Sequence, residues 1–243
     1  KEMMANKSWL TPYLFDKPQF EKPIFFYWLL ISAAKCFGVS PFVARFWPAF
    51  TGIVGMGVSY WISWMLFRSK QISFLTGLIL ATSAIYIALS RSVLTDMVFS
   101  ILVTISIGFF LFSYRYKKHK TKGLILSAVF SAMAVLTKGF LGVCFPVLVA
   151  LLFLIFKKDI RFLFCRSLLG AIGIFFLIAI PWHLIMLKTF GDEFWNEYFL
   201  NVHVRRLLEA EHERLDTWYF YLGTLIGGVL PWSLLLVSTV IFL

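Results

Sequence analysis

Charged residues are scarce in this sequence. Asp, Glu, Lys and Arg together make up 14% of the chain, whereas roughly a quarter of a typical soluble domain is charged. Hydrophobic residues account for 60% of the chain and aromatic residues for 19%. This composition excludes an ordinary soluble globular domain and predicts an integral membrane protein.

Cysteines and familiar catalytic motifs are also rare or missing. The three cysteines, Cys36, Cys144 and Cys165, lie far apart in apolar surroundings, without the spacing of a metal site or a disulfide framework. We interpret them as packing residues. No P-loop, Gly-rich dinucleotide fingerprint, Gly-x-Ser-x-Gly or His-Glu-x-x-His motif is present. The sequence therefore offers no sign of the chemistry that those motifs serve.

Long uncharged stretches dominate the chain instead, and none shows the alternation of a membrane β-barrel. We interpret seven of them as membrane-spanning helices, because helices satisfy every backbone group within lipid. Their ranges are 46–67, 72–90, 97–114, 123–137, 139–156, 167–187 and 217–243. The predicted fold class is an all-α polytopic membrane protein, with residues 1–243 forming a single transmembrane core.

The chain begins with Lys1, without an initiator methionine, and ends inside an apolar run. We therefore expect a piece of a longer protein, with a first helix upstream and a further C-terminal part. Residues 1–45 and 188–216 are the two long segments outside the predicted spans, and both are interpreted as loops on the outer face of the membrane.

The loops between the predicted spans differ in charge. If residues 1–45 lie outside, the inside loops are 68–71, 115–122 and 157–166. They contain the single acid Asp159 and eleven bases, namely Arg68, Lys70, Arg115, Lys117, Lys118, Lys120, Lys122, Lys157, Lys158, Arg161 and Arg166. The positive-inside rule supports this orientation. It also explains the net charge of +11 without nucleic-acid binding, because the basic clusters are short loops beside the membrane.

The stretch Gln19–Trp28 places Glu21 and Lys22 directly before a proline and an aromatic run. Twelve helical residues from Pro23 to Ala34 reach only ~18 Å, short of the ~30 Å hydrocarbon core. We expect an interfacial or re-entrant helix that holds the two charges at the water–lipid boundary. Two interpretations stay open: chemistry on a lipid headgroup, or an ordinary anchor with a snorkelling lysine.

Two further charges stand at the outer ends of predicted spans. Asp96 is costly inside a membrane helix, and Thr95-Asp96 is equally consistent with a helix N-cap. Arg91 is a candidate to pair with Asp96 or to bind phosphate. Lys138 interrupts an apolar stretch, either as a turn between helices or as a cation that steadies an anionic headgroup.

His203 lies in the long polar segment 188–216, followed by Arg206 and several acids. An exposed histidine in a solvated charge run is one interpretation. The other is that His203 and Glu21 share a metal ion or a proton with a carrier phosphate, although two ligands are few for a metal site.

Several phrases occur together in a fixed order: Phe20-Glu21-Lys22-Pro23, Tyr27-Trp28-Leu29, Pro41-x-x-x-Ala44-Arg45, Thr95-Asp96-Met97, Leu136-Thr137-Lys138-Gly139 and Asn201-x-His203-x-x-Arg206. Over nearly its whole length the chain thus resembles the aminoarabinose-transferase and protein-mannosyltransferase superfamily, closest to its bacterial aminoarabinose branch. The resemblance implies the C-type glycosyltransferase fold, family 39-like. Residues 1–12 are similar to the region that follows the family's first outer-loop Asp-Glu pair, the presumed catalytic base, which this chain does not include.

The resemblance also implies roles for individual residues. Lys22 is expected to contact the carrier phosphate, and Asp96 is expected to be the second acid of the site. Glu21 and His203 are expected to flank a metal or phosphate, with zinc or a similar divalent ion as the cofactor. The further phosphate-binding candidates are Arg91, Lys138 and Arg206.

These expectations lead to one functional hypothesis: an inverting glycosyltransferase of the bacterial inner membrane, with its site on the periplasmic or outer face. Its donor is a sugar on a polyprenyl phosphate, and its acceptor is lipid A, another envelope glycolipid or polysaccharide, or a protein hydroxyl. The alternatives are a protein O-mannosyltransferase-like enzyme and, from a different class, a lipid transporter or flippase. A transporter favours charges near the midplane and repeat symmetry, and the sequence shows neither.

Overall fold

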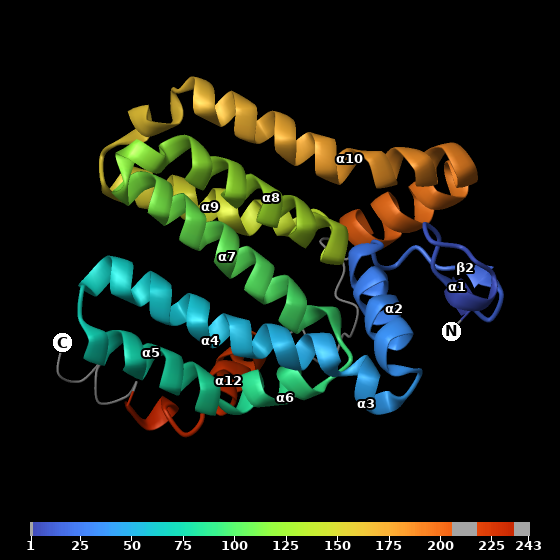
Figure 1. The fold of residues 1–243 in the computed structure, drawn as a ribbon, viewed down its shortest axis with the longest axis horizontal. Helices are drawn as coiled ribbons and strands as arrows, with labels where there is room; N and C mark the ends of the chain where they lie inside the picture. The colour runs from blue at the N-terminus through green and yellow to red at the C-terminus, as the bar shows by residue number, and fades with distance from the viewer. Residues whose placement is uncertain (1, 206–217, 236–243) are drawn as a thin grey trace.

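The computed structural model describes residues 2–205 and 218–235, which form a bundle of long helices with short elements packed across one end (Figure 1). The long helices are α4 (Phe46–Phe67), α7 (Thr95–Arg115), α8 (Lys120–Lys138) and α10 (Arg166–Phe194). Shorter helices beside them are α5 (Lys70–Thr82), α6 (Ala84–Arg91), α9 (Leu141–Phe156) and α12 (Trp218–Gly228). The remaining elements are α1 (Glu2–Ala5), α2 (Phe25–Phe37), α3 (Pro41–Ala44), the 3-10 helices η1 (Lys117–His119) and η2 (Ile160–Leu163), the π-helix η3 (Trp195–Arg205), and the strands β1 (Tyr13–Leu14) and β2 (Lys17–Pro18).

Four helical segments of the described chain are long and apolar enough to cross a membrane. They are Pro41–Phe67, Thr95–Arg115, Lys117–Lys138 and Arg166–Arg205. Each contains one of the predicted spans. Helix α9 matches a fifth predicted span, but its 16 residues fall below the ~20 that a membrane-spanning helix needs.

The predicted span 72–90 is broken at Ser83. Helices α5 and α6 meet there at an angle of 61°, because Ser83 has an extended backbone (φ −71°, ψ 131°) and its hydroxyl donates to the Ile79 carbonyl at 2.6 Å. The break frees the backbone amide of Ala84, which donates to the Leu230 carbonyl at 3.0 Å. Helices α5 and α6 are together long and apolar enough for one span, so the predicted span corresponds to a bent helix pair.

The last predicted span, 217–243, is corrected by the structure. Helix α12 ends at Gly228 after 11 residues, and a turn follows at 229–232. Trp232 Nε1–H donates to Thr82 Oγ1 at 2.7 Å, so this segment packs on the α5–α6 break. Residues 217 and 236–243 lie outside the described residues.

The loops gather at two opposite ends of the bundle, as the charge pattern predicts (Figure 1). At the end that we call the basic end, the Arg68 guanidinium donates to the Tyr116 hydroxyl at 2.9 Å, and the Lys120 ammonium donates to the Phe162 carbonyl at 2.8 Å. At the other end, which we call the mixed-charge end, lie the N-terminal segment, the starts of α4 and α7, and the ends of α8 and α10.

Small residues allow the central helices to approach closely. A Cβ on Gly142 of α9 would lie 2.3 Å from the Val135 backbone nitrogen of α8, so glycine is needed for this contact. The Ser131 hydroxyl donates to the Gly142 carbonyl across the same interface at 2.9 Å. Small side chains and interhelical hydrogen bonds are the usual means of helix association in lipid.

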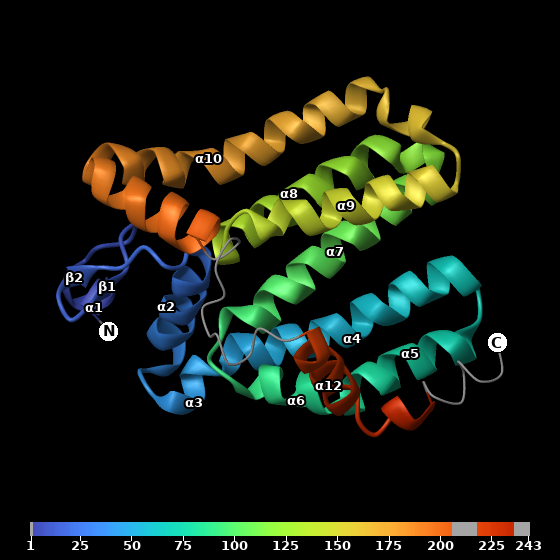
Figure 2. The ribbon, with the colours of Figure 1, turned by 180° about the vertical axis from the view of Figure 1, so that it is seen from behind.

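Helix α2 crosses the mixed-charge end of the bundle and does not run along it (Figures 1 and 2). Its 13 residues are too few to span a bilayer, as expected for an interfacial helix. Its buried residues are Phe26, Ile31 and Ala33, and Ile31 and Phe26 pack into two different apolar clusters. The helix therefore closes the mixed-charge end of the bundle.

A small hairpin adds to the predicted all-α architecture. Phe15 and Asp16 link β1 to β2, and both have positive φ angles (53° and 60°), as the two central residues of a type I′ turn do. The Glu2 carboxylate of α1 accepts both of their amides, at 3.2 and 3.3 Å.

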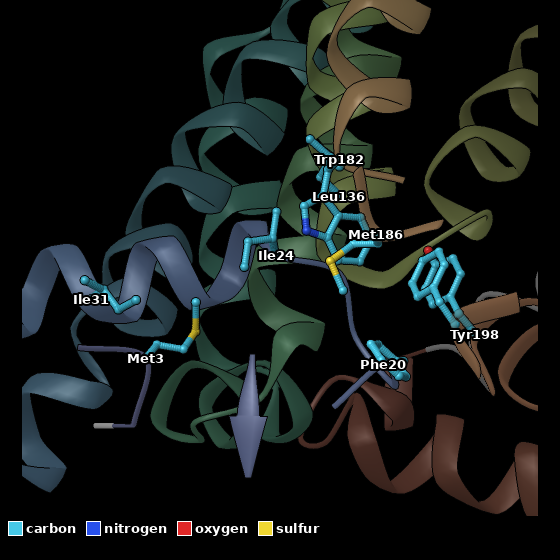
Figure 3. Close-up of a cluster of buried hydrophobic side chains, with 9 residues drawn as sticks. Met3, Phe20, Ile24, Ile31, Leu136, Trp182, Met186 and Tyr198 are labelled. Atoms are coloured by element: carbon cyan, nitrogen blue, oxygen red, sulfur yellow. The ribbon is translucent and has the colours of Figure 1, made fainter. Parts of the chain in front are cut away.

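A buried apolar cluster holds the mixed-charge end together (Figure 3). Its members come from the N-terminal segment, α2, α8, α10 and η3, and they are Met3, Phe20, Ile24, Ile31, Leu136, Trp182, Met186, Phe194 and Tyr198. Trp182 Nε1–H also donates to the Leu10 carbonyl at 2.9 Å. Segments that are far apart in sequence are thus fixed around one point.

Candidate functional site

An ion pair links two helix ends at the mixed-charge end. The Lys138 ammonium donates to Asp96 Oδ1. Asp96 lies in the first turn of α7, and Lys138 is the last residue of α8. The helix dipoles favour an acid at the first position and a base at the second. The ammonium also lies 5.6 Å from the centre of the Phe99 ring.

The structure decides between the alternatives for these charges. Helix α7 begins at Thr95 after Leu94, without a side-chain cap, so Asp96 is not an N-cap. The partner of Asp96 is Lys138 and not Arg91, which is exposed at the last residue of α6. Lys138 precedes the turn at Gly139, as its first interpretation predicts, and its ammonium pairs with Asp96. The headgroup interpretation stays a prediction.

His203 meets this turn from the far end of the chain. The Phe140 amide donates to His203 Nε2 at 3.3 Å, and His203 Nδ1–H donates to the Tyr198 carbonyl at 2.6 Å. A carbonyl oxygen only accepts and a backbone amide only donates, so these partners fix His203 as a neutral ring with its proton on Nδ1. The structure therefore brings Asp96, Lys138 and His203 together.

Tyr198 and His183 form a hydrogen-bond network next to His203. The Tyr198 side chain is buried, and its hydroxyl donates to His183 Nε2 at 3.0 Å. His183 Nδ1–H in turn donates to the Ala179 carbonyl at 2.7 Å. This network ties η3 to α10, and it lies beside the apolar cluster of Figure 3.

Glu21 and Lys22 stand between buried neighbours. Phe20 packs edge-on against the rings of Phe190 and Phe194, with centroids 5.1 and 5.4 Å apart. On the other side, Pro23 and Ile24 are fully buried. Phe20 and Ile24 belong to the same cluster as Leu136 and Tyr198, so the two charges are fixed near the end of α8 and near η3.

The pKa of Tyr27 indicates that Glu21 lies nearby. Burial of the phenol, together with the nearby negative charge of Glu21, raises the pKa of Tyr27 above its usual value. The Tyr27 hydroxyl donates to Gln19 Oε1 at 3.3 Å. Tyr27 is therefore a protonated hydrogen-bond donor at neutral pH, and Glu21 lies close enough to affect it.

The predicted metal site finds little support in the described residues. Within 2–205 and 218–235, no group of three or more His, Cys, Asp or Glu side chains is placed to hold a metal. Both ring nitrogens of His203 already have partners, so a metal ion at Nε2 would have to displace the Phe140 amide. The described residues alone therefore do not form a three-ligand metal site, and the metal stays a prediction.

The other predicted and missed residues can be placed briefly. Arg206 lies outside the described residues. The three cysteines are free thiols, but Cys36 is exposed, so its interpretation as a packing residue was wrong. Tyr198, Gly139 and His183 were not predicted as site residues. His183 lies one turn after Ala179 on an apolar helix. Nothing in the sequence there indicates that Tyr198, from a later element, contacts it.

A comparison with protein-family models gives one match. The family described as dolichyl-phosphate-mannose-protein mannosyltransferase matches residues 1–198. This range includes Glu21, Lys22, Asp96, Lys138 and Tyr198.

Curated relatives match over almost the whole chain. The undecaprenyl phosphate-alpha-4-amino-4-deoxy-L-arabinose arabinosyl transferase of Photorhabdus laumondii is 27% identical over 242 residues, which are 99% of this chain and 43% of that protein. The enzyme of the same name from Yersinia pestis is 30% identical over 236 residues, 96% of this chain and 42% of that protein. The chain thus spans less than half the length of these relatives.

Two solved structures have the same fold. ArnT from Cupriavidus metallidurans in the apo state superimposes with a TM-score of 0.84 at 25% identity, covering 96% of this chain and 42% of that one. The same protein bound to undecaprenyl phosphate gives a TM-score of 0.85 at 24% identity, with the same coverage. The predicted fold class is confirmed: the chain is an all-α polytopic membrane protein with the C-type glycosyltransferase core.

Proposed function

Because the chain belongs to the dolichyl-phosphate-mannose-protein mannosyltransferase family, we propose that it forms the membrane core of a glycosyltransferase that uses a polyprenyl-phosphate sugar. The names of the relatives support a bacterial undecaprenyl carrier. The acceptor in this proposal is an envelope molecule such as lipid A. The enzyme is an integral protein of the bacterial inner membrane.

The observation that carries the proposal is the ion pair between Asp96 and Lys138, with His203 beside it. A carboxylate at this position can act with the acid of the family's first outer loop to deprotonate or orient the acceptor hydroxyl. The ammonium of Lys138 has three N–H donors and gives one to Asp96. The proposed reaction therefore has a base and a cation fixed at one point of the molecule.

Lys22, Arg91, Lys138 and Arg206 are the proposed ligands of the carrier phosphate. As the sugar leaves the carrier, negative charge builds on the phosphate oxygens, and preorganised cations stabilise that charge in the transition state. Lys22 stands between Phe20 and Ile24, which both belong to the buried cluster and anchor its backbone on both sides. Its role is therefore the most sharply testable.

The site is proposed to face the periplasm. The basic end of the bundle gathers Arg68, Lys120 and their neighbours, and basic loops stay in the cytoplasm. The ion pair lies at the opposite end. This side also suits a polyprenyl carrier, whose chain stays in the bilayer while its phosphate lies at the surface.

A metal with Glu21 and His203 as ligands stays a prediction without a fitting site. Metal analysis of the purified full-length protein, before and after dialysis against a chelator, tests it directly. Less than about 0.1 metal ion per protein in an active preparation rules it out.

A protein O-mannosyltransferase is the second candidate function. The description of the matching family favours it, whereas the names of the relatives favour an aminoarabinose donor and a lipid acceptor. Reconstituted full-length protein offered each donor with each acceptor separates the two. Formation of glycosylated lipid A, without glycosylated protein, supports the first function.

The central test replaces Asp96 by asparagine in the full-length protein. We expect Asp96→Asn to lower kcat for sugar transfer by about 10²–10⁴-fold, the usual contribution of a general base. Asp159→Asn is the matched control, because Asp159 lies at the basic end, in the turn before η2.

Two results would contradict the proposal. One is transfer at the wild-type rate in both Asp96→Asn and Lys138→Met. The other is movement of labelled carrier lipid across the vesicle membrane without any glycoside product, which is the behaviour of a flippase.

A further inference from the structure

We propose that His203 is a positioning residue, which holds the turn after α8 and thereby directs Lys138 toward Asp96. The inference rests on the proposed function, because it concerns the geometry of that site. It assigns His203 a role through hydrogen bonds to protein groups and not through a metal.

The first support is the pair of hydrogen bonds made by the imidazole. It accepts the Phe140 amide at 3.3 Å through Nε2 and donates to the Tyr198 carbonyl at 2.6 Å through Nδ1. The last turn of a helix and the residues after it are the part most prone to fray. Lys138 is the last residue of α8, so a bond at Phe140 limits the movement of the lysine backbone.

The second support is the fit between the ring and Gly139. A Cβ on Gly139 would lie 2.2 Å from His203 Nε2 and 3.2 Å from the Tyr198 hydroxyl. Gly139 also has a φ of +90°, which other residues rarely adopt. In the turn after Lys138, the His203 imidazole therefore occupies the space that a side chain at position 139 would need.

The third support is the packing of Tyr198, which holds the His203 ring in place. The Tyr198 ring stacks on Phe194 with centroids 5.0 Å apart and planes 9° from parallel, and it meets the His203 ring edge-on at 4.6 Å. Its hydroxyl bonds to His183. His203 is thus held on a buried support that reaches back into α10.

The consequence concerns the ion pair. Without the imidazole, the Phe140 amide loses its acceptor and the Gly139 turn loses its neighbour, so Lys138 samples other positions. Displacement of a catalytic group by about 1 Å can cost on the order of 10²-fold in rate. Loss of His203 should therefore reduce turnover although the ring does not touch the proposed reacting atoms.

The experiment compares three substitutions at His203 in the full-length protein. The amide oxygen of His203→Gln can stand where Nε2 stands and accept from Phe140, whereas His203→Asn is too short to reach it and His203→Ala has no acceptor. We expect His203→Gln to keep kcat within about 3-fold, and His203→Asn and His203→Ala to lose about 10–100-fold. KM for the acceptor should change little in all three.

Gly139→Ala provides an independent test of the contact between Gly139 and His203. It should lower kcat about as much as His203→Ala, because its Cβ displaces the same ring. The double variant should lose much less than the product of the two single effects, since both act on one contact. Gly173→Ala, at an open position in α10, is the matched control and should keep wild-type kcat.

The outcomes separate this inference from the proposed function. If His203→Gln is as inactive as His203→Ala, and zinc analysis shows that both have lost metal, the positioning role is overturned in favour of a ligand role. If His203→Ala turns over at the wild-type rate while Asp96→Asn does not, only this inference fails. If Asp96→Asn and Lys138→Met both keep full activity, the proposed function itself fails.

Discussion

At the scale of single residues, the positions of Glu21 and Lys22 depend on their apolar neighbours. Glu21 is exposed and Lys22 is half-exposed, whereas Phe20 is 3% exposed and Ile24 is fully buried. Both belong to the cluster that also contains Leu136 and Tyr198. The location of Lys22, the proposed phosphate ligand, is therefore set by apolar residues that take no part in the proposed reaction.

This dependence can be tested with Phe20→Ala. Truncation of a buried phenylalanine typically costs about 3–5 kcal/mol, and here it also removes the anchor beside Lys22. We expect a lower midpoint of thermal unfolding in detergent and a KM for the sugar donor raised about 10-fold or more, the effect of about 1.4 kcal/mol of lost binding.

Phe15→Ala is the control for this prediction, because Phe15 is 84% exposed on the hairpin turn and lies in the same N-terminal segment. Its unfolding midpoint and donor KM should match those of the wild type. A Phe20→Ala protein with an unchanged donor KM would show that Lys22 does not bind the carrier phosphate.

The sequence drew attention to residues that the structure places near one another, but it did not predict their contacts. Asp96, Lys138 and His203 each stood out as a charge or histidine beside an apolar stretch, and loop charges placed them on one side. The pairing of Asp96 with Lys138 instead of Arg91 depends on which helix ends adjoin. The contact of His203 with Gly139 depends on Gly191, whose φ of 51° and ψ of −125° turn the chain back toward α8.

At the scale of elements, the break between α5 and α6 is the clearest departure from hydropathy. The stretch 72–90 is uncharged throughout, so composition alone cannot distinguish one straight helix from two bent ones. Thr82 and Ser83 are the available local signal, because hydroxyls compete for helix carbonyls. What stabilises the bend is remote: Leu230 accepts the Ala84 amide and Trp232 bonds to Thr82.

We expect Thr82→Val and Trp232→Phe each to destabilise the protein by about 1 kcal/mol, the usual net value of a hydrogen bond. The double variant should be little worse than either single one, because both remove the same bond. Unfolding midpoints measured in detergent provide the test, and strictly additive losses would contradict it.

Thr189→Val is the matched control for Thr82→Val. Thr189 in α10 makes the same bond to a carbonyl one turn earlier, at 2.8 Å to Ile185, without a tryptophan donor. Its substitution should leave the midpoint within about 1–2 °C of the wild-type value. The tryptophan bond is then the difference between the two threonines.

At the scale of the whole molecule, the two ends of the bundle have different charge. No Asp or Glu occurs between Lys22 and Asp96, and at the basic end Arg68 and Lys120 bond to neighbouring loops. The mixed-charge end contains both signs, with Asp96 and Lys138 paired. This polarity was predictable, because it follows from the alternation of loops along the chain.

The polarity predicts the labelling of two engineered thiols in whole cells. In a background without native cysteines, Lys17→Cys on the hairpin should react with an impermeant maleimide added outside the inner membrane. Lys118→Cys at the basic end should react only after lysis. A variant that keeps Cys36 as its single cysteine, exposed on α2, is the control and should behave like Lys17→Cys. Reaction of both engineered thiols from the same side would contradict the proposed topology.

The bond between Ala84 and Leu230 also sets an order of events during biosynthesis. The ribosome makes Ala84 long before Leu230, and at about 5–20 residues per second the delay is on the order of ten seconds. Within lipid, a backbone amide without an acceptor costs several kcal/mol. The newly made α5–α6 helix pair must therefore stay at the translocon, or use a temporary hydrogen-bond acceptor there, until the segment that contains Leu230 has been synthesised.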